Sequence, residues 1–104
     1  IIALTGSSPA YFFRFMEAMQ YSAEKMGFSA QDARFLVQQA VLGAAKLVQA
    51  NPDIPLSQLR ENVTSKGGTT EKALDVFEQQ HLAETIEQAM QAAISRATEM
   101  EQSL

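Results

Sequence analysis

Apolar residues recur every three or four positions over most of the chain, and glycine and proline interrupt this pattern at a few places only. This spacing is typical of α-helices, whereas a half-buried strand alternates apolar and polar residues. The pattern predicts five helices, over residues 8–27, 29–50, 55–63, 69–80 and 82–100. We therefore expect an all-α fold that forms one domain over residues 1–104.

Residues that favour helix ends set the bounds of the first two helices. Ser8 followed by Pro9 predicts a helix start, because Ser accepts from free amides and Pro is tolerated at the first helical position. Gly27 is expected to end this helix. Ser29 and Asp32 resemble a capping box and predict the start of the second helix.

Three further boundaries are predicted in the second half of the chain. Pro55 is expected to begin a short third helix. Thr69 or Thr70 is expected to cap the fourth helix after a turn that contains two glycines. The break between the fourth and fifth helices is expected near His81.

The first two predicted helices carry more apolar surface than the other three can cover. Residues 40–45 pass nearly two turns without a polar side chain, and polar residues in the first helix form one narrow stripe. A second copy of the chain would bury this surface, and Gly43 would permit close approach of crossing helices. Alternatively, both helices are central in a small bundle, where Gly43 costs ~1 kcal/mol against Ala. The pattern leaves both open.

Composition narrows the function classes. The chain has 104 residues, of which 46% are hydrophobic, and a formal charge of −4 from 8 basic and 12 acidic side chains. One core fits this length, but a catalytic domain and a separate cofactor domain do not. The absence of cysteine excludes disulfides, thiolate zinc sites and cysteine nucleophiles. Scattered basic residues argue against nucleic-acid binding, and no apolar run is long enough to predict a membrane span.

Two expectations concern the chain's start and its location. The sequence begins with Ile1 rather than with an initiator Met, and its opening residues lack the basic leader of a signal peptide. We therefore expect further residues before Ile1. We expect a cytoplasmic protein.

Residues 64–70 are the strongest candidate for a binding site. Two glycines allow the backbone to turn with positive φ and expose its amides, and hydroxyl groups and one ammonium surround them. The free amides of the next helix point to the same place, which favours a carboxylate or a phosphate. An ordinary helix–helix turn that binds nothing is the alternative. The spacing differs from that of a phosphate-binding loop, and no glycine-rich dinucleotide motif occurs in the chain.

His81 is the only histidine. It has no second ligand at metal spacing and no adjacent nucleophile, so we expect a role at a helix end or on the surface and no metal site.

Three runs together resemble the pyrroline-5-carboxylate reductase family. Residues 59–70, which read LRENVTSKGGTT, are similar to the substrate-loop signature of that family. Residues 3–11 resemble the entry into its C-terminal domain, and residues 41–46 resemble the middle of its dimer helix. The resemblance covers essentially the whole chain.

The resemblance implies a fold, a reaction and a partner. The family reduces 1-pyrroline-5-carboxylate to L-proline with NADPH or NADH, which binds in an N-terminal Rossmann domain that is absent from this chain. The chain would be the interlocked helical C-terminal domain, a homodimer that supplies the substrate loop. By itself it would bind no cofactor and be inactive.

The resemblance also implies roles for four residues. Ser65, Gly68 and Thr69 would hold the substrate carboxylate, and Thr70, the catalytic residue, would place its hydroxyl against the ring nitrogen. The carboxylate contacts agree with the anion site inferred from the residues. The roles also suit the chemistry, because hydride attack requires an electron-poor imine carbon and a fixed ring face.

The chain departs from the family pattern at two positions. Lys66 stands where the family often has Pro, and we expect its side chain to reach into solvent. Ser8 stands where the family commonly has Gly, which either suits a helix cap or alters the approach to the nucleotide domain.

Two other functions remain open. The first is a helical interaction module in which the glycine–threonine turn is only a cap. The second is closely related chemistry on another cyclic imino or 3-hydroxy acid.

Overall fold

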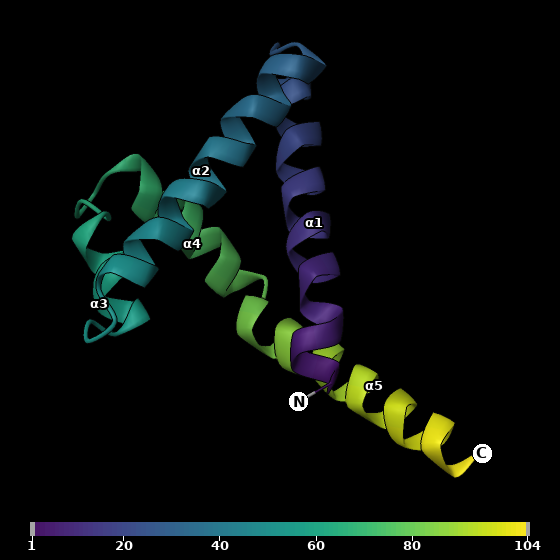
Figure 1. Cartoon of the computed structure of the whole chain (residues 1–104). Coiled ribbons are helices and arrows are strands. Elements are labelled where there is room, and N and C mark those ends of the chain that lie inside the picture. Colours follow the sequence, from purple (N-terminus) through teal and green to yellow (C-terminus); the bar gives the residue numbers. More distant parts are fainter. Residues whose placement is uncertain (1, 104) are drawn as a thin grey trace. The chain divides into compact units, whose positions relative to one another are not determined.

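The computed structural model describes residues 2–103 and the side chains of residues 6–103. Within these residues it contains five helices and no strand (Figure 1). The helices are α1 (Ile2–Lys25), α2 (Ala30–Ala50), α3 (Leu56–Asn62), α4 (Thr69–Gln79) and α5 (Leu82–Gln102). The prediction of an all-α fold is confirmed.

The chain divides into two compact units. One unit comprises residues 9–59 and holds most of α1, all of α2 and the start of α3. The other unit comprises residues 1–8 and 60–104 and holds the rest of α3 with α4 and α5.

The predicted start of the first helix at Ser8 and Pro9 is wrong. α1 already begins at Ile2, and Pro9 lies inside it. Pro9 has no amide to donate to the carbonyl four residues earlier, but the helix continues on both sides of this missing bond. The boundary between the two units falls between Ser8 and Pro9, so the proline marks this division rather than a helix start.

The turn between α1 and α2 requires a glycine. The amide of Phe28 donates to the carbonyl of Ala23 at 3.2 Å, and the amide of Gly27 donates to that of Glu24 at 3.0 Å. This pair of bonds is the Schellman motif, which places its penultimate residue in the left-handed region. Gly27 has a φ of 110°, so the predicted end of the first helix is confirmed.

Both ends of α2 agree with the prediction. The Oγ of Ser29 accepts a hydrogen bond from the amide of Asp32 at 3.1 Å, which is the forward bond of a capping box. At the other end the Nδ2 of Asn51 donates to the carbonyl of Leu47 at 2.8 Å.

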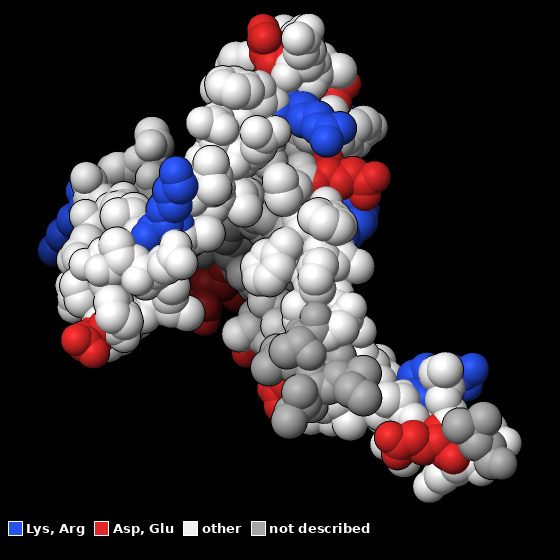
Figure 2. Space-filling view, viewed as in Figure 1, with Lys and Arg blue, Asp and Glu red and all other residues white. Residues whose placement is uncertain are grey.

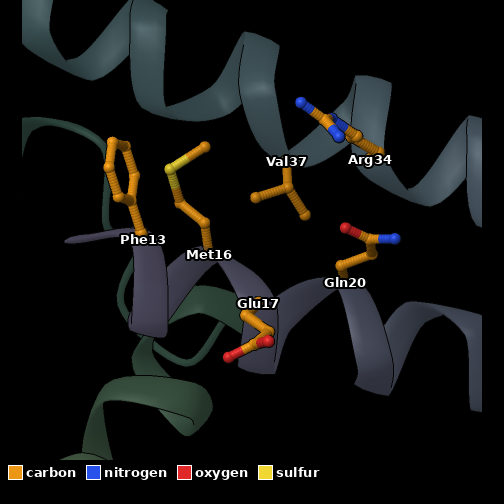
Figure 3. Close-up of a pocket in the computed structure, with 6 residues that line it drawn as sticks. All are labelled: Phe13, Met16, Glu17, Gln20, Arg34 and Val37. Atoms are coloured by element: carbon orange, nitrogen blue, oxygen red, sulfur yellow. The ribbon is translucent and has the colours of Figure 1, made fainter. Parts of the chain in front are cut away.

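α1 and α2 face each other along the halves of the two helices that adjoin their shared turn. Phe13 and Met16 point from α1 toward α2, and Val37 points back toward α1 (Figure 3). Ala33 is fully buried and Val37 is 6% exposed, and these are the only buried hydrophobic side chains among residues 6–103. The two helices separate away from the turn (Figure 1).

Most large apolar side chains of α1 and α2 are therefore uncovered. Phe12 is 63% exposed, Phe13 68% and Leu47 53%. In Figure 2 the charged side chains form a few small groups on a face that is otherwise uncharged. Within the unit of residues 9–59, α1 and α2 do not cover each other's apolar side chains. Exposed apolar area of this extent is typical of a protein–protein interface.

α4 and α5 are separated at His81, as predicted. His81 has φ 60° and ψ 48°, a left-handed conformation that interrupts the helical path. The amide and the Oγ1 of Thr85 donate to the carbonyl of His81, at 3.0 and 2.9 Å, and so fix the first turn of α5. None of the described helices combines the length and the hydrophobicity that a membrane span requires.

Candidate functional site

The candidate site is the loop between α3 and α4. At the end of α3 the Oγ1 of Thr64 donates to the carbonyl of Arg60 at 2.6 Å, and its amide donates to the carbonyl of Glu61 at 3.1 Å. These bonds hold Thr64 against the helix that precedes it. The part of the loop that is open to a ligand therefore begins at Ser65.

Residues 65–68 form a β-turn. The amide of Gly68 donates to the carbonyl of Ser65 at 3.0 Å. Gly67, the third residue of the turn, has a φ of 75°, whereas the φ of Lys66 is not positive. This combination identifies a type II turn, in which the third residue must be glycine or a residue that tolerates positive φ.

The structure corrects the predicted cap of the fourth helix. Gly68 is the N-cap and has no side chain to accept a bond, and Thr69 and Thr70 are the first two residues of α4. The first helical bond runs from the amide of Lys72 to the carbonyl of Gly68 at 3.4 Å. The amides of Thr69 and Thr70 therefore have no acceptor within the helix and point out of its N-terminal end.

Glu71 is a site residue that the sequence analysis missed. Its Oε1 accepts a hydrogen bond from the amide of Gly67 at 3.1 Å. In a capping box the third helical residue bonds to the amide of the N-cap. Here the N-cap amide belongs to Gly68 and is already bonded to the carbonyl of Ser65. The Glu71 carboxylate therefore accepts from the amide of the preceding residue, Gly67. A glutamate three positions after Gly68 is the sequence signal that could have revealed this contact.

The loop brings the four predicted site residues together on one short segment. The side chains of Ser65, Thr69 and Thr70 are exposed, and among the described residues their hydroxyl groups have no hydrogen-bond partner. The amide of Gly68 closes the turn. The arrangement can thus offer two helix-end amides and three hydroxyl groups to a small anion.

Lys66 and His81 both lie on the surface, as predicted. Lys66 is exposed, as expected from its place in the turn. The side chain of His81 is 77% exposed, and its Nδ1 lies 3.8 Å from Oε2 of Glu84 at the junction between two helices. Within the described residues no cluster of three or more His, Asp or Glu side chains could hold a metal ion.

The chain is similar to known reductases along most of its length. Residues 1–100 match a family model described as pyrroline-5-carboxylate reductase dimerisation. A pyrroline-5-carboxylate reductase from Haemophilus influenzae is 62% identical over 101 residues, which make up 97% of this chain and 37% of that protein. The chain therefore spans a little over a third of the relatives' length.

Two solved structures have the same fold. A pyrroline-5-carboxylate reductase from Coxiella burnetii matches with a TM-score of 0.90 and 46% identity, over 95% of this chain and 36% of that one. A pyrroline carboxylate reductase from Plasmodium falciparum with NADP bound matches with a TM-score of 0.91 and 31% identity, over 95% and 37%. The helical C-terminal domain is the part that corresponds to this chain. The chain thus belongs to the pyrroline-5-carboxylate reductase family, as its dimerisation domain.

Proposed function

We propose that this chain is the dimerisation and substrate-binding part of a reductase that converts 1-pyrroline-5-carboxylate to L-proline with NADPH or NADH. Membership of the family supports the reaction. The observation that carries the substrate-binding role is the turn of residues 65–68, which leads directly into the open N-terminal end of α4. The interaction-module alternative lacks this support, because it assigns no role to that end.

The substrate carboxylate binds at the N-terminal end of α4. The free amides of Thr69 and Thr70 donate to it, and the end of a helix carries the equivalent of ~+0.5 charge. The Ser65 hydroxyl donates from the other side of the turn. Gly68 contributes by closing the turn that carries Ser65, because its amide is bonded to the Ser65 carbonyl and a Cβ atom there would lie 3.2 Å from the same oxygen.

Thr70 acts on the imine. With the carboxylate held by the amides, the Thr70 hydroxyl hydrogen-bonds the ring nitrogen. Such a bond draws electron density from the imine carbon, which makes that carbon a better hydride acceptor. The same contact fixes which face of the ring is presented. No acid–base pair of the kind found in hydrolases is needed.

The nucleotide is held outside this chain. Residues 2–103 contain no strand, and a dinucleotide site of the Rossmann type needs a strand followed by a glycine-rich turn and a helix. The residues present do not fit NADPH or NADH. An N-terminal Rossmann domain supplies this site in the complete enzyme, and the chain alone is inactive.

A second copy of the chain completes the fold. The exposed apolar side chains of α1 and α2 need a cover, and the family model that matches the chain is one for dimerisation. A homodimer provides it, since the same surface is offered by both copies. The cytoplasmic location stays a prediction.

Steady-state kinetics of the full-length reductase with Thr70→Ala test the proposal. We expect kcat/KM for 1-pyrroline-5-carboxylate to fall by about 100-fold, the usual cost of one lost donor at a reacting centre. Thr98→Ala is the matched control, because Thr98 lies in α5 and its hydroxyl donates to the carbonyl of Ile94 in the same helix. Unchanged kinetics for Thr70→Ala contradict the site. Faster reduction of another cyclic imino acid or of a 3-hydroxy acid contradicts the substrate.

A further inference from the structure

The Glu71 carboxylate lies at the same end of α4 as the proposed substrate carboxylate. Its Oε1 accepts a hydrogen bond from the amide of Gly67 at 3.1 Å, and Glu71 is the third residue of α4. One side chain thereby joins the β-turn to the first turn of α4. Because the turn and the helix end together carry the proposed donors, this bond fixes the spacing between Ser65 and Thr70.

Glu71 forms no ion pair with a cationic side chain in the described part of the chain, although Lys66 is adjacent to Gly67 in sequence. Glu71 is half-buried, so solvent screens it less than it screens a fully exposed carboxylate. A negative charge in the first turn stabilises the helix, but it also lowers the positive potential that a second anion meets there.

We infer that Glu71 is a positioning residue with two opposing effects on the substrate. Its hydrogen bond to Gly67 holds the turn in the binding conformation, and its negative charge weakens the binding of the substrate carboxylate. The inference rests on the proposed function, since it takes the end of α4 as the carboxylate site. Glu71 thus limits product retention, because L-proline carries the same carboxylate and leaves more readily.

Two substitutions in the full-length reductase separate the effects. Glu71→Gln keeps an oxygen acceptor for the Gly67 amide and removes the charge. We expect the KM for 1-pyrroline-5-carboxylate and the inhibition constant of L-proline to fall by about threefold to tenfold, the size of a partly screened like-charge repulsion. Glu71→Ala removes the charge and the bond together, so both constants should rise above those of Glu71→Gln.

Three controls isolate the charge. Glu78→Gln makes the same change two turns further along α4 and should leave both constants within twofold of the wild-type values. The decrease in both constants caused by Glu71→Gln should become smaller as the salt concentration is raised, because screening reduces the repulsion between the two carboxylates. With 1-pyrroline, which has the ring nitrogen but no carboxylate, Glu71→Gln and the wild type should have equal KM values.

The outcomes distinguish this inference from the proposed function. If Thr70→Ala impairs turnover while Glu71→Gln leaves the L-proline inhibition constant unchanged or higher, the inference is wrong and the proposed function stands. Equal constants for Glu71→Gln and Glu71→Ala would overturn it as well, because the bond to Gly67 would then contribute nothing. If Thr70→Ala has no effect, the proposed function fails and the inference fails with it.

Discussion

The amide of Gly68 donates to the carbonyl oxygen of Ser65 across 3.0 Å, and a Cβ atom at Gly68 would lie 3.2 Å from that same oxygen. The φ of Gly68 is −89°, which any residue can adopt. Glycine is therefore needed at Gly68 for close approach and at Gly67 for positive φ, so the two neighbouring glycines have different physical roles.

Gly68→Ala should impair the proposed substrate site without unfolding α4. The added methyl group meets both the oxygen and the Cβ of Ser65, so the turn must move by a few tenths of an ångström. Misplacement of about 1 Å can cost 100-fold in rate, so we expect a loss of roughly 10-fold in kcat/KM. Kinetics of the full-length reductase, with circular dichroism as the folding control, provide the check. Normal kinetics with a normal spectrum would show that the turn tolerates the methyl group.

Lys66→Pro should stabilise the loop. Lys66 is the second residue of a type II turn, where φ is near −60°, the value that proline fixes. In the described part of the chain the Lys66 amide donates no hydrogen bond, so its loss is tolerated. We expect a gain of ~0.4–1 kcal/mol in the free energy of unfolding, through a more restricted unfolded chain.

Thermal unfolding at one fixed protein concentration measures this gain, because oligomers change their melting temperature with concentration. Lys66→Ala is the control for loss of the side chain and should lie near the wild type. A lower melting temperature for Lys66→Pro would contradict the assignment of the turn.

Ser29→Ala should destabilise α2. The substitution removes the acceptor of the Asp32 amide at 3.1 Å and leaves a helix-end donor without its partner. The expected loss is ~1 kcal/mol in the free energy of unfolding, measured with urea. Ser95→Ala is the control, because it removes the same hydroxyl group from a residue in the middle of α5. It should leave the free energy of unfolding unchanged or raise it slightly. Equal effects at the two serines would contradict the cap.

Gly43→Leu should disturb association more than helix content. A Cβ atom at Gly43 meets nothing within 4 Å in the chain, so the single copy has room for a larger side chain. In a dimer whose α2 helices cross closely there, the same side chain would hold the helices apart. Sedimentation measures association and circular dichroism measures helix content, with Gly43→Ala as a smaller step. Loss of helix with unchanged association would contradict the dimer contact.

Local signals predicted the ends of α2 correctly because both partners of each bond lie within four residues. Ser29 with Asp32, and Asn51 with Leu47, are pairs of this kind. The same reasoning failed at Pro9, because a proline that starts a helix and one that interrupts it have the same local signature.

The candidate loop could be located from its residues, but its internal bonds could not. Assigning the cap to Thr69 or Thr70 placed the helix start too late, because Gly68 satisfies the N-cap geometry without a side chain. The contact of Glu71 depends on the Gly68 amide being used by the turn, which sequence spacing does not reveal.

The choice between a bundle and a dimer could not be made from hydrophobic periodicity. Periodicity shows which side of a helix is apolar, but it does not show what covers that side. The exposure of Phe13 and Leu47 shows that α1 and α2 do not cover each other, and the match to a dimerisation family model favours a second copy as the cover.

A crystal structure of the full-length reductase with L-proline tests the central claim most directly. The account predicts the proline carboxylate within hydrogen-bond distance of the amides of Thr69 and Thr70, with the ring nitrogen beside the Thr70 hydroxyl. A well-ordered proline whose carboxylate is held elsewhere, with the N-terminal end of α4 bound only to water, would contradict it.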